Sequence, residues 1–545
     1  MLVDGCLKKR HRPHLLIWIS PRSIPSTNVM ASTVWYTAAA VLSFVPAFAA
    51  STSFEPARVI RSNAASQFTG CDILIHAGLS GKIFFSNDTE YAVTIQSYYS
   101  GDVRDVRPSC IFKPTTSQQV SDAIKALNSE AFGCWTVAIR SGGHSPFPSN
   151  NAANGVTIDL GGINSITYTD NPDSQGHGIA ALGPGGRWGE VYSALEEQGV
   201  MTTGGREGHG GVGGFLLGGG FSWYSAKYGL SADNVLNYEV VLANGSLIEA
   251  NATAHADLFK ALKGGMNNLG VVTRFDLRTF PANDIYGGIV AFAFTEKEPV
   301  VQSFITMIRD NEENPAESGF VSLSWGPGRD PSVAFITANV DGVSNSSSFA
   351  GLADLGPLVD TRSAVPNSEF VKQLQGTLGL YNVWFTQSFH ATMEMGRKVL
   401  EVFEAFIADL EGKLDEDATI IFVMTPLSTN FANNGPNILG LNEELTEPSV
   451  VLQVECLLPT PNDEALLTGK FEAVIDDISE YAASIGQSTK FKYINYAHQT
   501  QDPLQSYGGD NQDFLEKVAQ SYDPNGFFQH RVSGGFKISK SIGAF

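Results

Sequence analysis

The densest run of glycines in the chain lies between Gly204 and Gly220. Within it, Gly208-His-Gly-Gly-Val-Gly213 matches the G-x-G-x-x-G pattern of dinucleotide-binding loops, and Asp233 follows about 20 residues later. The preceding residues, Gln198 to Arg206, do not have the pattern of the buried strand that a Rossmann loop requires. Because glycine loses more backbone freedom on folding than other residues, the run indicates either structural turns or bare amides that approach a pyrophosphate. Its density favours pyrophosphate binding.

A second glycine turn carries a histidine. Trp135-Thr-Val-Ala-Ile-Arg140 has the pattern of a strand, and Ser141-Gly142-Gly143 interrupts it directly before His144. A lone histidine in a loop is usually an ordinary surface residue. Two glycines let the backbone turn sharply, however, and a neutral imidazole is a nucleophile near neutral pH. Together with the downstream run, Arg140 to His144 is therefore a candidate ligand-binding turn.

Helices and strands alternate around these motifs. Apolar positions spaced by three and four residues predict the helices, and strict alternation or short apolar runs predict the strands. The predicted helices are Ser117–Leu127, Gly189–Gln198, Ala254–Leu262, Val399–Leu410 and Ala465–Ile485; the predicted strands are Val156–Leu160, Ile163–Tyr168, Asn237–Leu242, Val271–Leu277, Ile289–Phe294 and Ile420–Met424.

Length and composition indicate a globular enzyme with more than one domain. The 545 residues exceed one ordinary hydrophobic core, and 43% hydrophobic with 17% charged residues argues against disorder. Motif density falls after Pro281, so we expect a first domain over residues 50–283 and a second over 284–480, a sheet with helices on one side. Glycine and aromatic residues become frequent again in 481–545.

Residues 1–49 have the pattern of a removable leader. The apolar stretch from Met30 to Pro46 precedes Ala47-Phe-Ala49, an A-x-A cleavage pattern, and Met30 is a candidate start of translation. Polar interruptions and short length argue against a membrane span. The sequence therefore predicts secretion, and four sequons suit a secreted glycoprotein: Asn87, Asn244, Asn251 and Asn345.

The net charge limits the possible binding partners, and the cysteines bear on the redox compartment of the protein. Without the leader the chain would hold 30 basic and 55 acidic residues, a net charge of −25, which argues against nucleic acid or an anionic membrane as partners. The remaining cysteines are Cys71, Cys110, Cys134 and Cys456, and an oxidising compartment predicts at least one disulfide among three possible connectivities. Zinc-ligand spacings are missing from the sequence, so we expect no metal site.

Seven motifs in order carry a resemblance to a known family. From about residue 70 to 540, the chain resembles the berberine bridge enzyme-like oxidases of the vanillyl-alcohol oxidase and p-cresol methylhydroxylase superfamily, particularly secreted fungal members. The motifs are Pro108-Ser-Cys-Ile-Phe-Lys-Pro, Arg140-Ser-Gly-Gly-His, Val156-Thr-Ile-Asp-Leu, Gly183-Pro-Gly-Gly-Arg-Trp-Gly, Gly211-Val-Gly-Gly-Phe-Leu-Leu-Gly-Gly-Gly, Gly264-Gly-Met-Asn-Asn-Leu-Gly and Tyr493-Ile-Asn-Tyr.

This resemblance implies an α+β fold with bound FAD. It implies two small α/β subdomains for the cofactor, completed by residues 481–545, and a substrate domain with an antiparallel sheet backed by helices. His144 matches the family histidine that bonds to the flavin 8α-methyl carbon. The other implied FAD contacts are Arg140, Ser141, Gly142, Gly143, Ser145, Gly205, Gly208, Gly211, Gly213, Gly214, Gly219, Gly220, Val272 and Asn495.

The family pattern also makes predictions about cysteines. Many relatives have a second flavin link through a cysteine in the glycine run, where this chain has Glu207, and no cysteine lies between Cys134 and Cys456. We therefore expect a single covalent bond, through His144. The resemblance further suggests a disulfide between Cys71 and Cys134.

For catalysis, the resemblance implies a tyrosine base near the flavin. Tyrosine serves as a base only when neighbours lower its pKa from about 10, so Tyr496 is favoured and Tyr493 is the alternative, beside the interpretation of both as core aromatics on a strand. The predicted protein is a secreted monomeric oxidase that takes hydride from an alcohol or amine carbon of a small molecule and reduces O2 to H2O2. The alternatives are a dehydrogenase with another electron acceptor, against which Gly205 weakly favours oxygen access, and a silent flavin carrier.

Overall fold

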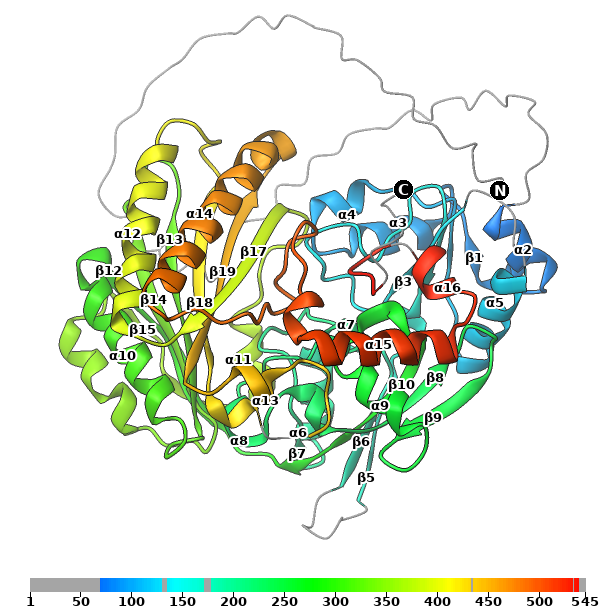
Figure 1. Cartoon of the computed structure of the whole chain (residues 1–545), viewed down its shortest axis with the longest axis horizontal. Helices are drawn as coiled ribbons and strands as arrows, with labels where there is room; N and C mark the ends of the chain where they lie inside the picture. The colour runs from blue at the N-terminus through cyan, green and yellow to red at the C-terminus, as the bar shows by residue number, and fades with distance from the viewer. Residues whose placement is uncertain (1–68, 130–134, 171–177, 433–434, 533, 539–545) are drawn as a thin grey trace, which may run out of the picture.

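The computed structural model describes residues 69–129, 135–170, 178–432, 435–532 and 534–538 (Figure 1). The predicted leader over residues 1–49 lies outside this part of the chain. The described residues form four sheets, of which three position the site. The predicted domain limits at 283 and 480 are not defined by the structure and stay a prediction.

The first sheet holds the strand that leads to His144. Its strand order is β1-β2-β4-β3, and β2, β4 and β3 run parallel. Helix α5, Ser117–Ser129, packs its buried face, including Val120 and Ile124, on this sheet. The bounds are β1 Ile83–Phe84, β2 Cys110–Phe112, β3 Val137–Arg140 and β4 Val156–Asp159.

The second sheet is antiparallel and follows in the sequence, with the order β5-β6-β10-β8-β9. Helices α6 (Trp188–Glu196) and α9 (Ala256–Leu262) belong to the hydrophobic core that also contains residues of this sheet. Its bounds are β5 Ile166–Thr169, β6 Ile179–Leu182, β8 Val235–Val241, β9 Leu247–Asn251 and β10 Val271–Arg278.

The largest sheet has eight antiparallel strands, and its helices α10, α12 and α14 lie on one side (Figure 1). Successive residues of a strand point to opposite faces, so alternate residues of β19, such as Val454 and Cys456, pack in the core with the helices. The opposite face packs in part against the core of the second sheet, through residues such as Ile289, Ile336 and Val451. The bounds are β12 Ile285–Ala293, β13 Glu317–Trp325, β14 Ser332–Asn339, β15 Val359–Asp360, β16 Ser363–Val365, β17 Tyr381–His390, β18 Thr419–Leu427, β19 Ser449–Leu458, α10 Lys297–Asp310, α12 Met393–Leu410 and α14 Glu464–Ser484.

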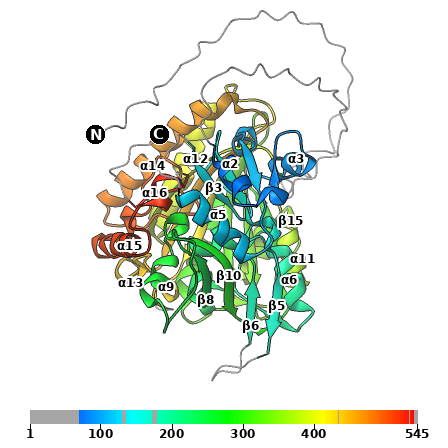
Figure 2. The same ribbon diagram turned by 90° about the vertical axis from the view of Figure 1, so that its right-hand side faces the viewer.

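The segment after α14 crosses back to the first two sheets. Helix α15, Gly509–Tyr522, lies beside α9 (Figure 2). The Tyr522 hydroxyl donates a hydrogen bond to Asp257 in the first turn of α9. Farther on, the amide of Val137 in β3 donates to the carbonyl of Arg531 at 2.7 Å. The predicted α+β class and the antiparallel sheet backed by helices are confirmed. Tyr496, by contrast, lies in a turn over residues 494–496 and Tyr493 lies just before it, so neither is on a strand.

The predicted disulfide between Cys71 and Cys134 is wrong. Cys71 pairs with Cys110, with 6.1 Å between their Cα atoms, a separation that suits a disulfide. The pairing joins the first turn of α2 (Gly70–His76) to the start of β2, because α2 packs against α5 over the first sheet. Cys134 lies outside the described residues, and Cys456 is a buried free thiol in β19.

Candidate active site

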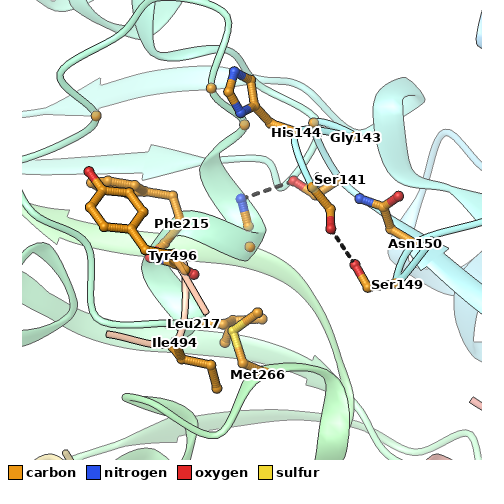
Figure 3. A pocket seen from close by; sticks show the side chains of 18 of the residues that line it. Ser141, Gly143, His144, Ser149, Asn150, Phe215, Leu217, Met266, Ile494 and Tyr496 are labelled. Carbon is orange, nitrogen blue, oxygen red and sulfur yellow. Dashed lines mark hydrogen bonds between the residues drawn. The ribbon is translucent and has the colours of Figure 1, made fainter. Parts of the chain in front are cut away.

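A cavity of ≈ 430 Å³ lies where the loops of the first two sheets meet the face of the eight-stranded sheet that is turned away from helices α10, α12 and α14. In Figure 3, His144 and its neighbours approach from one side, and residues of helix α7 (Val212–Leu217) and of the late segment approach from the other. The large sheet contributes side chains from β13, β17, β18 and β19: Phe320, Trp384, Val423, Gln453 and Glu455.

The turn before His144 is anchored by a buried ion pair. Arg140 donates to Asp159 at 2.7 Å, both side chains are at most 5% exposed, and the Arg140 guanidinium lies over the ring of Tyr98. Ser141 then joins the two glycine-rich segments, since its hydroxyl donates to the Pro184 carbonyl and accepts from the Gly213 amide (Figure 3). Arg140 therefore holds the turn in place and does not itself line the cavity.

Glycine is required where the two segments touch. A Cβ atom on Gly142 would lie 2.4 Å from the Gly211 Cα atom, well inside van der Waals contact, and Gly143 has a φ of +67°. Gly214 has open space where its side chain would be, and it lines the cavity. Closely packed backbone with exposed amides suits a pyrophosphate.

Most of the residues predicted to contact the cofactor come together here, although four do not. Gly208 packs against Gln375, Gly219 and Gly220 turn the chain with φ of +104° and +81°, and Arg140 lies beneath the turn. The predicted residues that line the cavity are Ser141, Gly142, Gly143, His144, Ser145, Gly205, Gly211, Gly213, Gly214, Val272, Tyr493, Asn495 and Tyr496.

Gly205 was expected to favour oxygen access, but its packing gives a simpler reason for a glycine at this position. A Cβ atom on Gly205 would lie 2.5 Å from the Trp188 ring, and the Gly205 carbonyl accepts a hydrogen bond from Tyr192. Packing on these aromatic residues therefore accounts for glycine at this position, whichever electron acceptor the protein uses.

Three buried polar atoms of residues that line the cavity have no hydrogen-bond or ion-pair partner among the described residues. Two are donors, the indole Nε1 atoms of Trp188 and Trp384, and one is an acceptor, the amide Oδ1 of Asn150. Buried polar atoms are nearly always hydrogen-bonded, so these atoms point to a bound group that offers acceptors and donors. FAD has both, along with the pyrophosphate that the glycine turns suit, and the residues present therefore fit this cofactor.

His144 is held from two directions. Its ring stacks on Tyr99 with 4.1 Å between ring centroids, and its Nε2 lies 3.4 Å from an oxygen of Glu207. Burial on its own raises the pKa of Glu207, but interactions with His144 and His209 outweigh that effect and lower the pKa to about 2. The carboxylate beside His144 is therefore ionised at physiological pH.

The two late tyrosines have different surroundings. The Tyr493 hydroxyl accepts from the Phe221 amide and from Asn495, and burial, followed by the neighbouring Tyr496, raises the pKa of Tyr493. Tyr496 instead accepts a hydrogen bond from the Arg206 guanidinium at 2.6 Å, an arrangement that is complementary to a phenolate. Of the two tyrosines, Tyr496 is the better placed proton acceptor.

Sequence reasoning missed a carboxyl group on the large sheet. Glu455 of β19 lines the cavity, accepts a hydrogen bond from Gln453 at 2.6 Å, and burial raises its pKa to about 8. A detectable signal existed: Gln453 and Glu455 lie two residues apart, and so on one face, and they interrupt the apolar residues of strand Ser449–Leu458. Arg206 was missed as well, because only the fold places it against Tyr496.

Other site types have no support in the described part of the chain. It contains no group of three or more His, Cys, Asp or Glu side chains arranged to hold a metal ion. Among the described helices, none combines the length and the apolar character needed to cross a lipid bilayer.

Comparisons with known proteins agree with this site. The family described as FAD binding domain matches residues 108–251, which contain both glycine-rich segments. A relative from Aspergillus calidoustus, named FAD-dependent monooxygenase drtC, is 34% identical over 86% of this chain and 90% of its own length. Another from Emericella nidulans, FAD-dependent monooxygenase sdcF, is 30% identical over 86% of this chain and 98% of its own.

Solved structures share the fold. 6-Hydroxy-D-nicotine oxidase from Arthrobacter nicotinovorans matches with a TM-score of 0.67 and 20% identity over 83% of this chain and 97% of that one. Berberine bridge enzyme from Eschscholzia californica matches with a TM-score of 0.63 and 17% identity over 86% and 99%. With the site, the sequence relatives and the fold in agreement, the chain belongs to the berberine bridge enzyme-like FAD-dependent oxidoreductases of the vanillyl-alcohol oxidase and p-cresol methylhydroxylase superfamily.

Proposed function

We propose that this protein is a secreted, monomeric FAD-dependent oxidase that removes hydride from an alcohol or amine carbon of a small molecule and produces H2O2 from O2. When bound, FAD accepts the hydride and passes the electrons on. One observation carries the proposal: Tyr496, paired with Arg206, faces the same cavity as the glycine turns.

The proton of the substrate is assigned to Tyr496. Arg206 stabilises negative charge on the phenolic oxygen, so Tyr496 can accept the proton of an alcohol or ammonium group as hydride leaves the adjacent carbon. Glu455 is protonated below a pH of about 8 and can donate a hydrogen bond to a substrate oxygen from the sheet.

The rest of the cavity wall favours an aromatic or otherwise apolar substrate. Phe320, Leu374, Trp384 and Val423 line it around the polar groups. Apolar walls with a few polar groups are typical of sites that orient a small organic molecule. We therefore assign the substrate to apolar alcohols or amines in preference to free sugars, which expose many hydroxyl groups.

His144 is the proposed covalent tether. Of the two ring nitrogens, Nε2 lies beside Glu207, which leaves Nδ1 to bond to the flavin 8α carbon. In His144→Ala we expect FAD to dissociate in acid and the oxidation rate to fall, because the tether also raises the flavin potential. Acid precipitation tests this: yellow colour that stays on the His144→Ala polypeptide would place the tether elsewhere.

A monooxygenase is the second candidate, since the sequence relatives drtC and sdcF are named FAD-dependent monooxygenases. The two functions differ in the fate of oxygen. An oxidase releases one H2O2 for each substrate oxidised, whereas a monooxygenase inserts an oxygen atom into its product and consumes an additional reductant.

The deciding experiment is oxygen accounting with the purified protein. Aromatic alcohols and amines are supplied under ¹⁸O2 while O2 uptake, H2O2 and product mass are measured. We expect equal O2 uptake and H2O2 release with unlabelled product. Label in the product would support the monooxygenase, and turnover with an artificial electron acceptor alone would support a dehydrogenase. Secretion is tested separately by N-terminal sequencing of protein from culture medium, where we expect a start after Ala49.

A further inference from the structure

Glu207, within the glycine-rich run, lies beside the imidazole of His144. Its Oε2 atom is 3.4 Å from His144 Nε2, and both side chains are 25% exposed. The two residues are far apart in sequence, yet both line the cavity. A carboxylate in this position has a direct effect on which ring nitrogen carries the proton.

The carboxylate itself is held in place. Its Oε2 atom accepts a hydrogen bond from the Gly210 amide at 2.8 Å, and its Oε1 atom lies 3.2 Å from Nδ1 of His209. Since interactions with the two histidines lower the pKa of Glu207 to about 2, the group is a fixed negative charge at physiological pH. Tyr99 stacks on one face of the His144 ring and limits its rotation.

We propose that Glu207 is a positioning residue for covalent attachment of the flavin, which orients His144 so that Nε2 carries the proton and Nδ1 has the free lone pair. The inference rests on the proposed tether. Neutral imidazole has one N–H and one lone pair, and a hydrogen-bonded partner selects between the two tautomers.

The charge of Glu207 also suits the bond-forming step. A C–H bond of the flavin 8α-methyl group breaks, a bond from Nδ1 to that carbon forms, and the imidazole becomes positively charged until it loses the Nε2 proton. The two protons and two electrons removed leave with O2 as H2O2, so the net change is FAD, His144 and O2 to histidyl-FAD and H2O2. A carboxylate beside Nε2 stabilises the developing positive charge.

Glu207→Gln tests this with a readout that is independent of turnover. The amide oxygen of glutamine can still accept from Gly210, so the loop keeps its hydrogen bond while the charge is lost. We expect bound FAD within about twofold of the native protein but attachment about tenfold slower, the scale of one hydrogen bond to a charged group. The protein is incubated with FAD, and flavin fluorescence on denaturing gels is followed over time.

Two further variants separate positioning from folding. Glu207→Asp should restore much of the attachment rate because it keeps the charge. His209→Ala should attach flavin clearly faster than Glu207→Gln does, because the Gly210 amide still holds the charged carboxylate beside His144. Equal attachment in Glu207→Gln and the native protein would overturn the proposal. So would a loss in His209→Ala as large as that in Glu207→Gln, since this would indicate a role in loop structure.

The control for the proposed function is the native protein itself. If its flavin dissociates fully in acid, the tether and the role of Glu207 both fail, whereas FAD binding and substrate oxidation stand. If flavin is attached but no substrate yields H2O2, the oxidase assignment fails and the role of Glu207 stands. The attachment assay and the H2O2 assay therefore give separate answers.

Discussion

The two ends of the cavity differ in what lines them: one end is mainly backbone, and the other is mainly side chains. At the loop end, the two glycine-rich segments present mainly backbone, and they touch so closely at Gly142 and Gly211 that a side chain on either would clash. At the sheet end, side chains of β17, β18 and β19 form the wall. Backbone can grip a pyrophosphate in any member of the family, whereas side chains are free to vary with the substrate.

We therefore expect the loop end of the cavity to tolerate substitutions less well than the sheet end. In Gly142→Ala, the new Cβ atom would lie 2.4 Å from the Gly211 Cα atom, and backbone cannot move aside as a flexible side chain can. We expect the variant to lose its flavin and at least about 1–3 kcal/mol of stability, as measured by visible absorbance and urea unfolding. Gly376→Ala is the matched control, since it has open space and lies outside the cavity. Native flavin content in Gly142→Ala would show that flavin binding does not depend on the close backbone contact between Gly142 and Gly211.

Next to the sheet end, Tyr496 of the late segment packs edge-on against Trp384 of β17. Side-chain changes there should leave the cofactor bound and impair chemistry. We expect Tyr496→Phe to keep its FAD and reduce the flavin between about 10²- and 10⁴-fold more slowly, the usual contribution of a general base. Anaerobic stopped-flow measurement of flavin reduction gives this rate directly. A rate within a few-fold of the native value would show that Tyr496 is not the base, and Tyr493→Phe is the companion variant.

Arg206 should matter only through Tyr496. We expect Arg206→Gln to slow flavin reduction by about 10- to 100-fold, because a hydrogen bond from a charged donor to the phenolate is lost. In the Tyr496→Phe background, the same change should have little further effect, since the two residues act as a unit. Full additivity in this double-mutant cycle would show that Arg206 acts on the substrate or the cofactor instead.

Glu455 gives the smallest expected effect, on stability. Burial raises its pKa to about 8, so between pH 5 and pH 8 the folded protein binds more protons than the unfolded chain, and stability falls as the pH rises through this range. Water in the cavity screens part of the effect, and we expect a decline of roughly 1–2 kcal/mol that Glu455→Gln lacks. Urea unfolding of both proteins at pH 5, 6.5 and 8 measures the difference. Parallel curves would show that Glu455 titrates normally.

The same contrast explains what the sequence could predict. The glycine turns and His144 are local patterns, so sequence located them and the structure brings them to one cavity. The strands of the large sheet were also predictable from apolar alternation, as at Ile420–Met424 within β18. The ends of these strands were harder to predict. The strand predicted over Ile289–Phe294 is β12, Ile285–Ala293, because pairing with β14 sets its limits.

Long-range pairs could not be predicted from sequence. Arg206 and Tyr496 are separated by 290 positions and meet only because the late segment crosses back. Glu207 was visible only as a missing cysteine, and its contact with His144 depends on two loops packing glycine on glycine. The disulfide pairing was predicted wrongly for the same reason. Three connectivities were possible from the sequence, and the position of α2 on the first sheet selects Cys110 as the partner of Cys71.

The return of the late segment also has a consequence for biosynthesis. Tyr493 to Ala497 line the cavity, and the Arg531 carbonyl accepts from β3, the strand that leads to His144. A ribosome-bound chain without these residues has an open site, with neither Asn495 nor Tyr496 in place. Stable flavin loading must therefore follow the completion of translation, and chains shortened at the C-terminus should accumulate without cofactor, however well their earlier sheets fold.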